Sequence, residues 1–256
     1  MRVRNSKVRI GDLVLGKQPV YCVTVLESTA TAAAAAATAA MQAGADCLEL
    51  RLDKLKDLSE VGALVRAVRS PAIGVCRRPK WDGFFEGSER ERVSRLFKAI
   101  EEGIPAVDVD LITPPALRRD VIRAAKARGT TVMISYENFQ RTPSAARLLR
   151  TLREEKALGA EIGKFAVMAT SYRDVLTVLD VTIEARRRLG IPFVAIAMGA
   201  WGSSSRPVGL LFGAAMTYGC TAKGKEGAPG QLPVAEVRQI VESLAGEPGK
   251  SSVSDS

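Results

Sequence analysis

Histidine is absent from the 256 residues of this sequence. Histidine is the commonest metal ligand in proteins, and the side chain whose ordinary pKa lies closest to neutral pH. Its absence excludes histidine-ligated metals, serine–histidine–aspartate triads and any acid–base chemistry by an imidazole.

Cysteine is scarce, and its spacing excludes the usual frameworks. The chain has four cysteines with no CxxC pair among them, and three lie in apolar, strand-like runs. This distribution predicts buried free thiols rather than disulfides or a zinc site. The four are Cys22, Cys47, Cys76 and Cys220.

Long apolar runs are also missing. The N-terminal residues include several basic side chains but no apolar run of signal-peptide length. The alanine-rich stretch over residues 29–40 is too short and too weakly hydrophobic to span a bilayer, whereas its helix propensity is high. We therefore expect a cytoplasmic protein with no membrane partner.

A net charge of +9 comes from 37 basic and 28 acidic residues. The basic residues are spread over helical segments without interleaved aromatics, and no nucleic-acid reader motif is present. The charge favours a small-molecule ligand bearing a carboxylate or phosphate over a nucleic-acid partner.

The chain alternates strand-like and helix-like segments with regular spacing. After an expected β-hairpin at residues 2–16, eight strand–helix repeats occupy about 220 residues, which matches a (β/α)₈ TIM barrel. We predict one barrel domain over residues 1–246 and a disordered tail at 247–256. A doubly wound open sheet is the alternative, but no GxGxxG follows the first strand. The expected strands span 19–25, 47–53, 71–76, 106–111, 131–137, 161–169, 192–199 and 215–220.

The sixth strand, within Glu161–Ser171, places Lys164 among apolar residues. A buried ammonium is costly, so the lysine could reach a strand end or pair with a carboxylate. Alternatively, desolvation lowers its pKa and makes it an imine-forming nucleophile.

Other polar residues fall where strands of a barrel end. Glu49, Arg51 and Asp53 share one face of their strand, either as a salt-bridge ladder that closes the barrel or as part of a site. Ser135 and Glu137 share a face of the fifth strand. After the seventh strand, a glycine- and serine-rich loop leads to Arg206, either as a carboxylate clamp or as an ordinary loop and helix cap.

Several motifs together resemble the type I 3-dehydroquinate dehydratases, which are (β/α)₈ enzymes of the shikimate pathway. The likeness runs from about Pro19 to Leu244. The matching segments are Glu49-Leu50-Arg51-Leu52-Asp53, Arg78-Pro79-Lys80-Trp81-Asp82-Gly83, Ser135-Tyr136 with Phe139 and Thr142-Pro143, Lys164-Phe165-Ala166-Val167-Met168-Ala169, Ser205-Arg206, Thr217-Tyr218 and Ala228-Pro229-Gly230-Gln231.

The resemblance implies a lyase that dehydrates 3-dehydroquinate to 3-dehydroshikimate through a Schiff base on Lys164. It implies that Arg206 holds the substrate carboxylate, while Glu49, Arg51, Asp82 and Gln231 position hydroxyls and tune the lysine. We expect Arg51 and Arg206 to disfavour the ammonium form of Lys164. No cofactor or metal is implied, and a homodimer is expected.

Three positions depart from the family pattern. Glu137 stands where the family has its catalytic histidine, Asp82 replaces a glutamate, and Gly227 replaces a serine that would touch substrate. A neighbouring cation should keep the pKa of Glu137 low, so we expect imine formation to persist but turnover to be slow or shifted to lower pH. The alternatives are a Schiff-base lyase or aldolase acting on another carboxylated ketone, and a catalytically silent homologue. Glycines in the loop 223–231 permit it to close as a lid.

Overall fold

A computed structural model describes residues 8–245 of the chain. The expected disordered tail at 247–256 lies outside the described residues, as do both ends of the expected domain over 1–246. The one-domain assignment therefore stays a prediction.

Eight parallel strands form a ring in the order β10-β3-β4-β5-β6-β7-β8-β9. The first and last members of this order meet, because the backbone N–H of Ala215, just before β10, donates to the carbonyl of Phe193 in β9 at 2.9 Å. This closure confirms the predicted (β/α)₈ barrel, and the open doubly wound alternative is wrong. The strands are β3 (Val20–Val25), β4 (Cys47–Arg51), β5 (Ala72–Val75), β6 (Ala106–Asp110), β7 (Thr131–Asn138), β8 (Ile162–Met168), β9 (Phe193–Met198) and β10 (Met216–Gly219).

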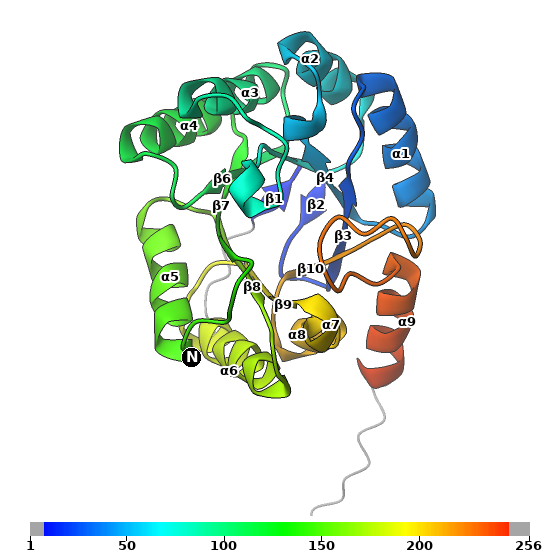
Figure 1. Ribbon diagram of the computed structural model, residues 1–256, viewed down its shortest axis with the longest axis vertical. Helices are drawn as coiled ribbons and strands as arrows, with labels where there is room; N and C mark the ends of the chain where they lie inside the picture. The colour runs from blue at the N-terminus through cyan, green and yellow to red at the C-terminus, as the bar shows by residue number, and fades with distance from the viewer. Residues whose placement is uncertain (1–7, 246–256) are drawn as a thin grey trace, which may run out of the picture.

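Helices surround the ring of strands (Figure 1). Helix α1 packs through the alanines that the sequence repeats at helical spacing, since Ala30, Ala33, Ala37 and Ala40 are its buried residues. The other helices are α2 (Leu58–Ala67), α3 (Glu89–Glu101), α4 (Pro115–Ala127), α5 (Ala145–Ala157), α6 (Tyr172–Arg188), α7 (Gly199–Gly202), α8 (Ser205–Phe212) and α9 (Val234–Ala245), while α1 spans Ala30–Gln42. Short 3₁₀ turns follow β4 at Leu52–Lys54 and β5 at Pro79–Trp81.

The predicted hairpin is confirmed over its described residues, where β1 (Arg9–Ile10) pairs antiparallel with β2 (Leu13–Val14). Ile10 is fully buried and belongs to the apolar cluster inside the barrel, together with Met133 and Met216. Thr131 Oγ1 also donates to the carbonyl of Arg9 at 2.6 Å. The hairpin therefore covers the amino-terminal end of the barrel, and it lies behind the strands in Figure 1.

The interior changes from apolar to charged along the strands. In β6, for example, Ala106 belongs to the apolar interior cluster, whereas Asp108 and Asp110, two and four residues later, are buried acids. Strand register brings the charged residues to one level, because Asp110 pairs with Ser135 and Ser135 pairs with Lys164 across neighbouring strands. The carboxyl end of the barrel is therefore the polar end, where sites of this fold lie.

Two further predictions can be compared with the structure. All four cysteines are buried and free, as expected. Among residues 8–245, no helix has the length and apolar character needed to cross a membrane.

Candidate active site

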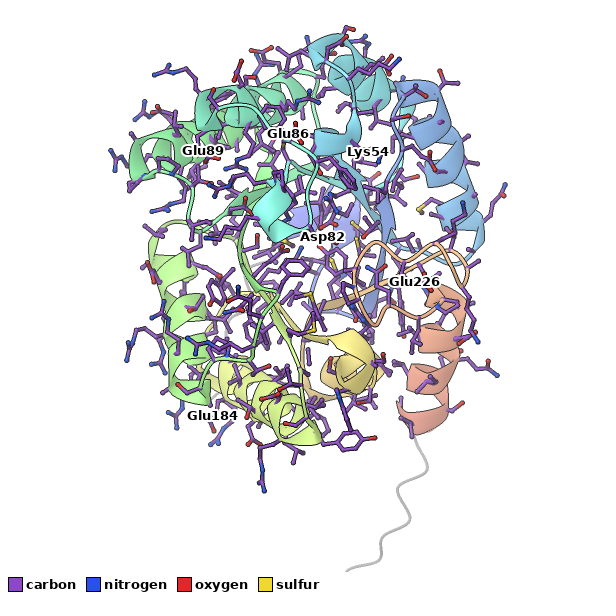
Figure 2. The ribbon with its side chains drawn as sticks, viewed as in Figure 1. Lys54, Asp82, Glu86, Glu89, Glu184 and Glu226 are labelled. Atoms are coloured by element: carbon purple, nitrogen blue, oxygen red, sulfur yellow. The ribbon has the colours of Figure 1, made fainter. Side chains whose placement is uncertain are left out.

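A cavity of about 40 Å³ at the carboxyl end of the barrel is lined by all eight site residues that the sequence indicated. They are Glu49, Arg51, Asp82, Glu137, Lys164, Arg206, Gly227 and Gln231. A wider hollow of about 310 Å³ adjoins it and shares Asp82 and Gly227 with it. Figure 2 shows Asp82 near the centre of the ring and Glu226 on the neighbouring loop.

A larger hollow, of about 440 Å³, lies elsewhere. Its lining comes from the segment after the hairpin and from α6, β9 and α8, and its cations are the exposed Lys17 and Arg186. None of the buried charges of the barrel interior line it, so we place the chemistry in the smaller cavity.

Lys164 lies at the centre of a buried ionic cluster. Its side chain is only 4% exposed, and Nζ is 3.1 Å from Glu49 Oε2 and 3.1 Å from Asp108 Oδ2. Nζ also lies 3.9 Å from Glu137 Oε1 and 3.4 Å from the Tyr218 hydroxyl. The lysine is therefore paired with carboxylates, as one of the alternatives from the sequence had it.

The expected low pKa of Lys164 is wrong. Burial lowers the pKa of this amine, but Glu49 and Asp108 outweigh burial and raise it above its ordinary value. The cation that lowers it most is Arg77, and not Arg51 or Arg206 as expected. Without substrate, Lys164 is therefore held as an ammonium ion.

Arg77 follows β5 and was not singled out from the sequence. Its side chain is 3% exposed and contacts Asp108 at 2.7 Å and Glu137 at 2.9 Å. It also pairs with Asp110 and donates to Ser135 Oγ at 3.0 Å. The guanidinium therefore joins the two carboxylates of β6 to Glu137, the one carboxyl of β7.

Glu137 has a pKa raised to about 7, because burial outweighs the opposing effects of Arg77 and Lys164. The sequence correctly predicted that Lys164 lowers the pKa of Glu137, but it missed the larger, opposite effect of burial. The predicted low pKa of Glu137 is therefore wrong. At neutral pH both protonation states of this carboxyl are populated.

Arg51 lines the cavity and also forms an ion pair of the kind that the ladder alternative predicted. It forms a two-point ion pair with Asp53, at 3.0 and 2.8 Å, and donates to the backbone carbonyl of Asp82 at 2.7 Å. Glu49 does not join this ladder, since it pairs with Lys164 and accepts from Thr24 Oγ1 at 3.3 Å. Arg51 thus ties the segment after β5 to the mouth of the cavity.

Arg206 is a buried cation whose bonds go to backbone carbonyls. It is 1% exposed, and it donates to Gly230 at 2.8 Å, Pro229 at 3.0 Å and Tyr218 at 3.1 Å. Burial lowers its pKa to about 10, which shows how little neighbouring negative charge compensates it. A ligand carboxylate would supply that charge.

The expected loop before Arg206 is mostly helical. Residues Gly199–Gly202 form α7, and Ser205 begins α8 with its Oγ bonded to the backbone of Ala197. The serines at 203–205 do not line the cavity, whereas Arg206 does. Of the segment predicted to clamp a carboxylate, only the guanidinium of Arg206 therefore lines the cavity.

Gly227 and Gln231 are joined within the loop that follows β10. The N–H of Gly227 donates to Gln231 Oε1 at 2.7 Å. A Cβ at position 227 would lie 2.7 Å from Thr24 Cβ, closer than real contacts allow. Glycine is therefore required here while the loop keeps this position.

Three residues of the cluster escaped the sequence reasoning, namely Arg77, Asp108 and Asp110, whereas Tyr218 was noted only as part of a matching segment and was given no role. The two aspartates carried a usable signal, since they alternate along an apolar strand in the same way as Glu49 and Arg51. Within residues 8–245, no group of histidine, cysteine, aspartate and glutamate is arranged to hold a metal ion.

A (β/α)₈ barrel with a buried lysine among carboxylates and a buried arginine at its carboxyl end defines a class of barrel enzymes that act on small anionic molecules. The family model for type I 3-dehydroquinase matches residues 21–248. The chain belongs to that family.

Relatives and solved structures agree with this assignment. The 3-dehydroquinate dehydratase of Methanosarcina barkeri is 37% identical over 245 residues, covering 93% of this chain and 99% of the relative. That of Methanothermobacter thermautotrophicus is 37% identical, with 88% and 97% covered. The crystal structure of the Geobacillus kaustophilus enzyme superposes with a TM-score of 0.89 at 28% identity, covering 97% of this chain and 100% of that one. The type I enzyme of Clostridium difficile, solved with covalently modified comenic acid, gives a TM-score of 0.86 at 25% identity, with 93% and 97% covered.

Proposed function

We propose that this protein is a lyase that dehydrates 3-dehydroquinate to 3-dehydroshikimate, in the shikimate pathway, through a Schiff base on Lys164. The observation that carries the proposal is the position of Lys164 Nζ, 3.1 Å from two carboxylates in a cavity that also contains Arg206. The names of the relatives support the substrate. The covalently modified ligand in the Clostridium difficile relative supports a covalent step.

The raised pKa of Lys164 is compatible with imine formation. An ammonium and a ketone together yield an iminium and one water, so the charge on the nitrogen is the same before and after. The carboxylates that stabilise the ammonium therefore stabilise the iminium as well. Glu49 or Asp108 accepts one ammonium proton before the amine attacks the ketone carbon, and this proton and a second one from the nitrogen then pass to the carbonyl oxygen, which leaves as water.

The iminium withdraws electrons from the neighbouring carbon, and Glu137 then removes a proton from that carbon. The resulting enamine expels the hydroxyl group, which takes the proton back from Glu137 and leaves as water. Hydrolysis of the new iminium frees the product and restores Lys164. A pKa of about 7 allows one carboxyl to serve first as base and then as acid.

The remaining groups bind and orient the substrate. Arg206 holds the substrate carboxylate with the donors that its backbone partners leave unused. Glu49, Arg51, Asp82 and Gln231 line the same cavity and face the substrate hydroxyls. The loop that carries Gly227 opens to admit the substrate, since the cavity is only about 40 Å³ in this conformation.

The proposal extends to the setting of the enzyme, a cytoplasmic homodimer. The resemblance to the family supports the dimer, and so do exposed apolar side chains on one side of the barrel. Tyr172 and Leu176 of α6 are 68% and 53% exposed, and Trp201 of α7 stacks edge-on against Tyr172. Sedimentation at micromolar concentration distinguishes the dimer from a monomer.

Borohydride trapping tests the central claim. The protein is incubated with 3-dehydroquinate, reduced and digested, and we expect the reduced adduct on Lys164 by mass spectrometry, with none in Lys164→Met. A parallel assay for the conjugated enone product identifies the reaction. An adduct without enone indicates a Schiff-base lyase or aldolase for another carboxylated ketone. The absence of both the adduct and the enone indicates a silent homologue.

A further inference from the structure

The hollow of about 440 Å³ has no part in the proposed chemistry, although it is larger than the catalytic cavity and the space that adjoins it. It lies where β3, β9 and β10 begin, at the end of the barrel opposite the catalytic cavity, since Pro19, Phe193 and Ala215 line it. The two cavities share no lining residue. A hollow of this volume is large enough for a small organic ligand.

Arg186 faces this hollow and not the acid of its own helix. Of three consecutive arginines in the last turn of α6, Arg187 and Arg188 pair with Glu184, at 3.4 and 3.2 Å. Within the part of the chain that the structure describes, Arg186 forms neither an ion pair nor a hydrogen bond. Its guanidinium therefore lines the hollow with its donors unused.

The stem of Arg186 is held in place by the glycine that ends α8. A Cβ at Gly213 would collide with Arg186 Cδ, and the φ of +117° at Gly213 is one that residues with a side chain rarely adopt. The stem therefore crosses the end of α8 where only a glycine leaves room for it. Such packing reduces the entropy that the side chain loses when it binds a ligand.

The described lining of the hollow carries further positive charge and no acid. Lys17 lines it from the segment before β3, and among residues 8–245 this lysine too forms no ion pair or hydrogen bond. Lys156 of α5 adjoins it, because a Cβ at the lining residue Gly190 would lie 3.3 Å from Lys156 Nζ. Three cations around one hollow attract an anion.

The carboxyl ends of α6 and α8 also border the hollow, and the partial negative charge of such helix ends repels anions. Their carbonyls are already bonded here. Lys156 Nζ donates to the carbonyl of Leu189 at 2.6 Å. The N–H of Gly213 donates to the carbonyls of Gly209 and Leu210, at 3.0 and 3.2 Å. These bonds and the ammonium of Lys156 offset the charge of the helix ends.

Most of the remaining lining is apolar and rigid. Backbone hydrogen bonds fix it, since the N–H of Ala215 donates to Phe193 at 2.9 Å and the N–H of Val20 donates to Ala215 at 3.2 Å. The hollow thus combines a cationic rim with an apolar wall. The apolar lining residues are Ile191, Pro192, Phe193, Leu210, Ala214 and Ala215.

We propose that this hollow binds a small phosphate monoester, with the phosphate on Arg186 and Lys17 and an apolar body against the wall that β9 and α8 provide. A guanidinium offers phosphate two parallel hydrogen bonds, and an ammonium adds a point charge. A doubly charged phosphate gains more from three nearby cations than a carboxylate does. Because the hollow is separate from the catalytic cavity, the inference does not depend on the proposed dehydration.

Calorimetric titration of the full chain with phenyl phosphate, inorganic phosphate and benzoate tests the class of ligand. We expect one site per chain for phenyl phosphate, with a Kd at least about tenfold below that of inorganic phosphate, because the ring buries apolar area. Benzoate, with a single charge, should bind more weakly than phenyl phosphate. No binding of phenyl phosphate, or equal binding of either comparison ligand, overturns the inference.

Adjacent arginines provide the matched pair that locates the site. Arg186→Gln should weaken the binding of phenyl phosphate about tenfold, since a hydrogen-bonded charge is lost. Arg187→Gln removes the same charge from a residue that pairs with Glu184, and it should bind as the wild type does. Gln18→Glu, which adds an acid to the lining, should also weaken binding. Equal losses in the two arginine variants would show non-specific attraction to a basic surface and overturn the inference.

Arg206→Gln separates this site from the catalytic cavity. Its affinity for phenyl phosphate should equal that of the wild type. Binding that is lost in Arg206→Gln but kept in Arg186→Gln places the anion in the catalytic cavity and overturns the inference. The proposed function fails by a different result, because the absence of a borohydride adduct on Lys164 leaves the binding of phenyl phosphate unchanged.

Discussion

The side chain of Glu155 accepts a hydrogen bond from the backbone N–H of Lys164 at 2.9 Å. Glu155 belongs to α5, outside the barrel, and is completely buried. Burial raises its pKa well above the ordinary value, which favours the neutral acid. Gly163 makes room for it, since a Cβ there would lie 3.0 Å from Glu155 Oε2. A helix outside the barrel thus supports the strand residue whose side chain lies at the centre of the ionic cluster inside.

Substitutions of Glu155 should separate hydrogen bonding from charge. Glu155→Ala leaves a cavity and an unpaired buried N–H, and we expect it to lower the free energy of unfolding by about 2–4 kcal/mol. Glu155→Gln keeps the acceptor and should be at least as stable as the wild type at neutral pH. Urea unfolding of both variants measures this, and a fully stable Glu155→Ala would contradict the role.

The pH dependence of the Glu155 effect has a definite sign. The folded state keeps a proton that the unfolded chain releases above about pH 4.3. Wild-type stability should therefore fall as pH rises from that value toward the raised folded pKa, whereas Glu155→Gln lacks this loss. The stability difference in favour of Glu155→Gln should therefore grow as pH rises above about 4.3.

Glu137→Gln removes the proposed acid–base group with little change in shape. We expect kcat/KM to fall by about 10²–10⁴-fold, the usual contribution of such a group, while borohydride still traps Lys164. In the wild type, kcat/KM should fall about tenfold for each pH unit below pH 7, because only the deprotonated carboxyl removes the substrate proton. A lower-pH optimum, as the sequence led us to expect, would indicate a different base.

Glu184→Gln is the control for this experiment. Glu184 lies on α6 at the outside of the barrel, where it pairs with Arg187 and Arg188, and Figure 2 shows it away from the central cavity. Its kinetics should match those of the wild type. Slow turnover of the wild type remains a prediction, and the maximum kcat over the pH range tests it.

Arg206→Gln should weaken substrate binding by about ten- to a hundredfold in KM, since a hydrogen bond to a charged group contributes about 1.5–3 kcal/mol. In the wild type, an anionic substrate supplies the negative charge that the buried guanidinium lacks, so its addition should raise Tm. The Tm shift should shrink in Arg206→Gln. Arg187→Gln, at an exposed position on α6, is the matched control. An unchanged KM in Arg206→Gln would show that the substrate carboxylate binds elsewhere.

Gly227→Ser restores the family residue but should not improve the enzyme. The new Cβ would lie 2.7 Å from Thr24 Cβ, so the loop must shift. The shift should disturb the hydrogen bond between Gly227 N–H and Gln231 Oε1. We expect a higher KM for Gly227→Ser, partly relieved in Gly227→Ser/Thr24→Gly. Improved kcat/KM in the single variant would show that the loop already samples a position with room for a side chain.

The sequence predicted which residues gather but not how they are paired. Alternation along a strand tells which face Glu49 or Lys164 occupies, and the barrel brings those faces to one end. The protonation of Lys164 depends instead on which neighbours reach Nζ, and that follows from register, as in the pairing of Ser135 with Lys164. Because the carboxylate of Asp108 reaches Nζ at 3.1 Å, the pKa of the amine rises where burial alone would lower it.

Other features depended on tertiary contacts that local patterns do not carry. Of the two adjacent arginines after β5, only Arg77 continues into the interior, while Arg78 pairs with Glu89. The glycines and serines at 199–205 indicated a loop, yet packing against β9 holds most of the segment in helical turns, with Ser205 bonded to Ala197. The buried end of Glu155 carried no signal, because a glutamate in a charged helix is ordinarily solvent-exposed.

The hairpin β1–β2 fills the amino-terminal end of the barrel with Ile10 and its neighbours. Because packed apolar side chains occupy that end of the described barrel, we expect exchange with solvent through the opening at the carboxyl end, where the cavity lies. Substrate entry, product departure and escape of the eliminated water all share that route. Under the proposed chemistry, anything that obstructs the opening stops the reaction in both directions at once.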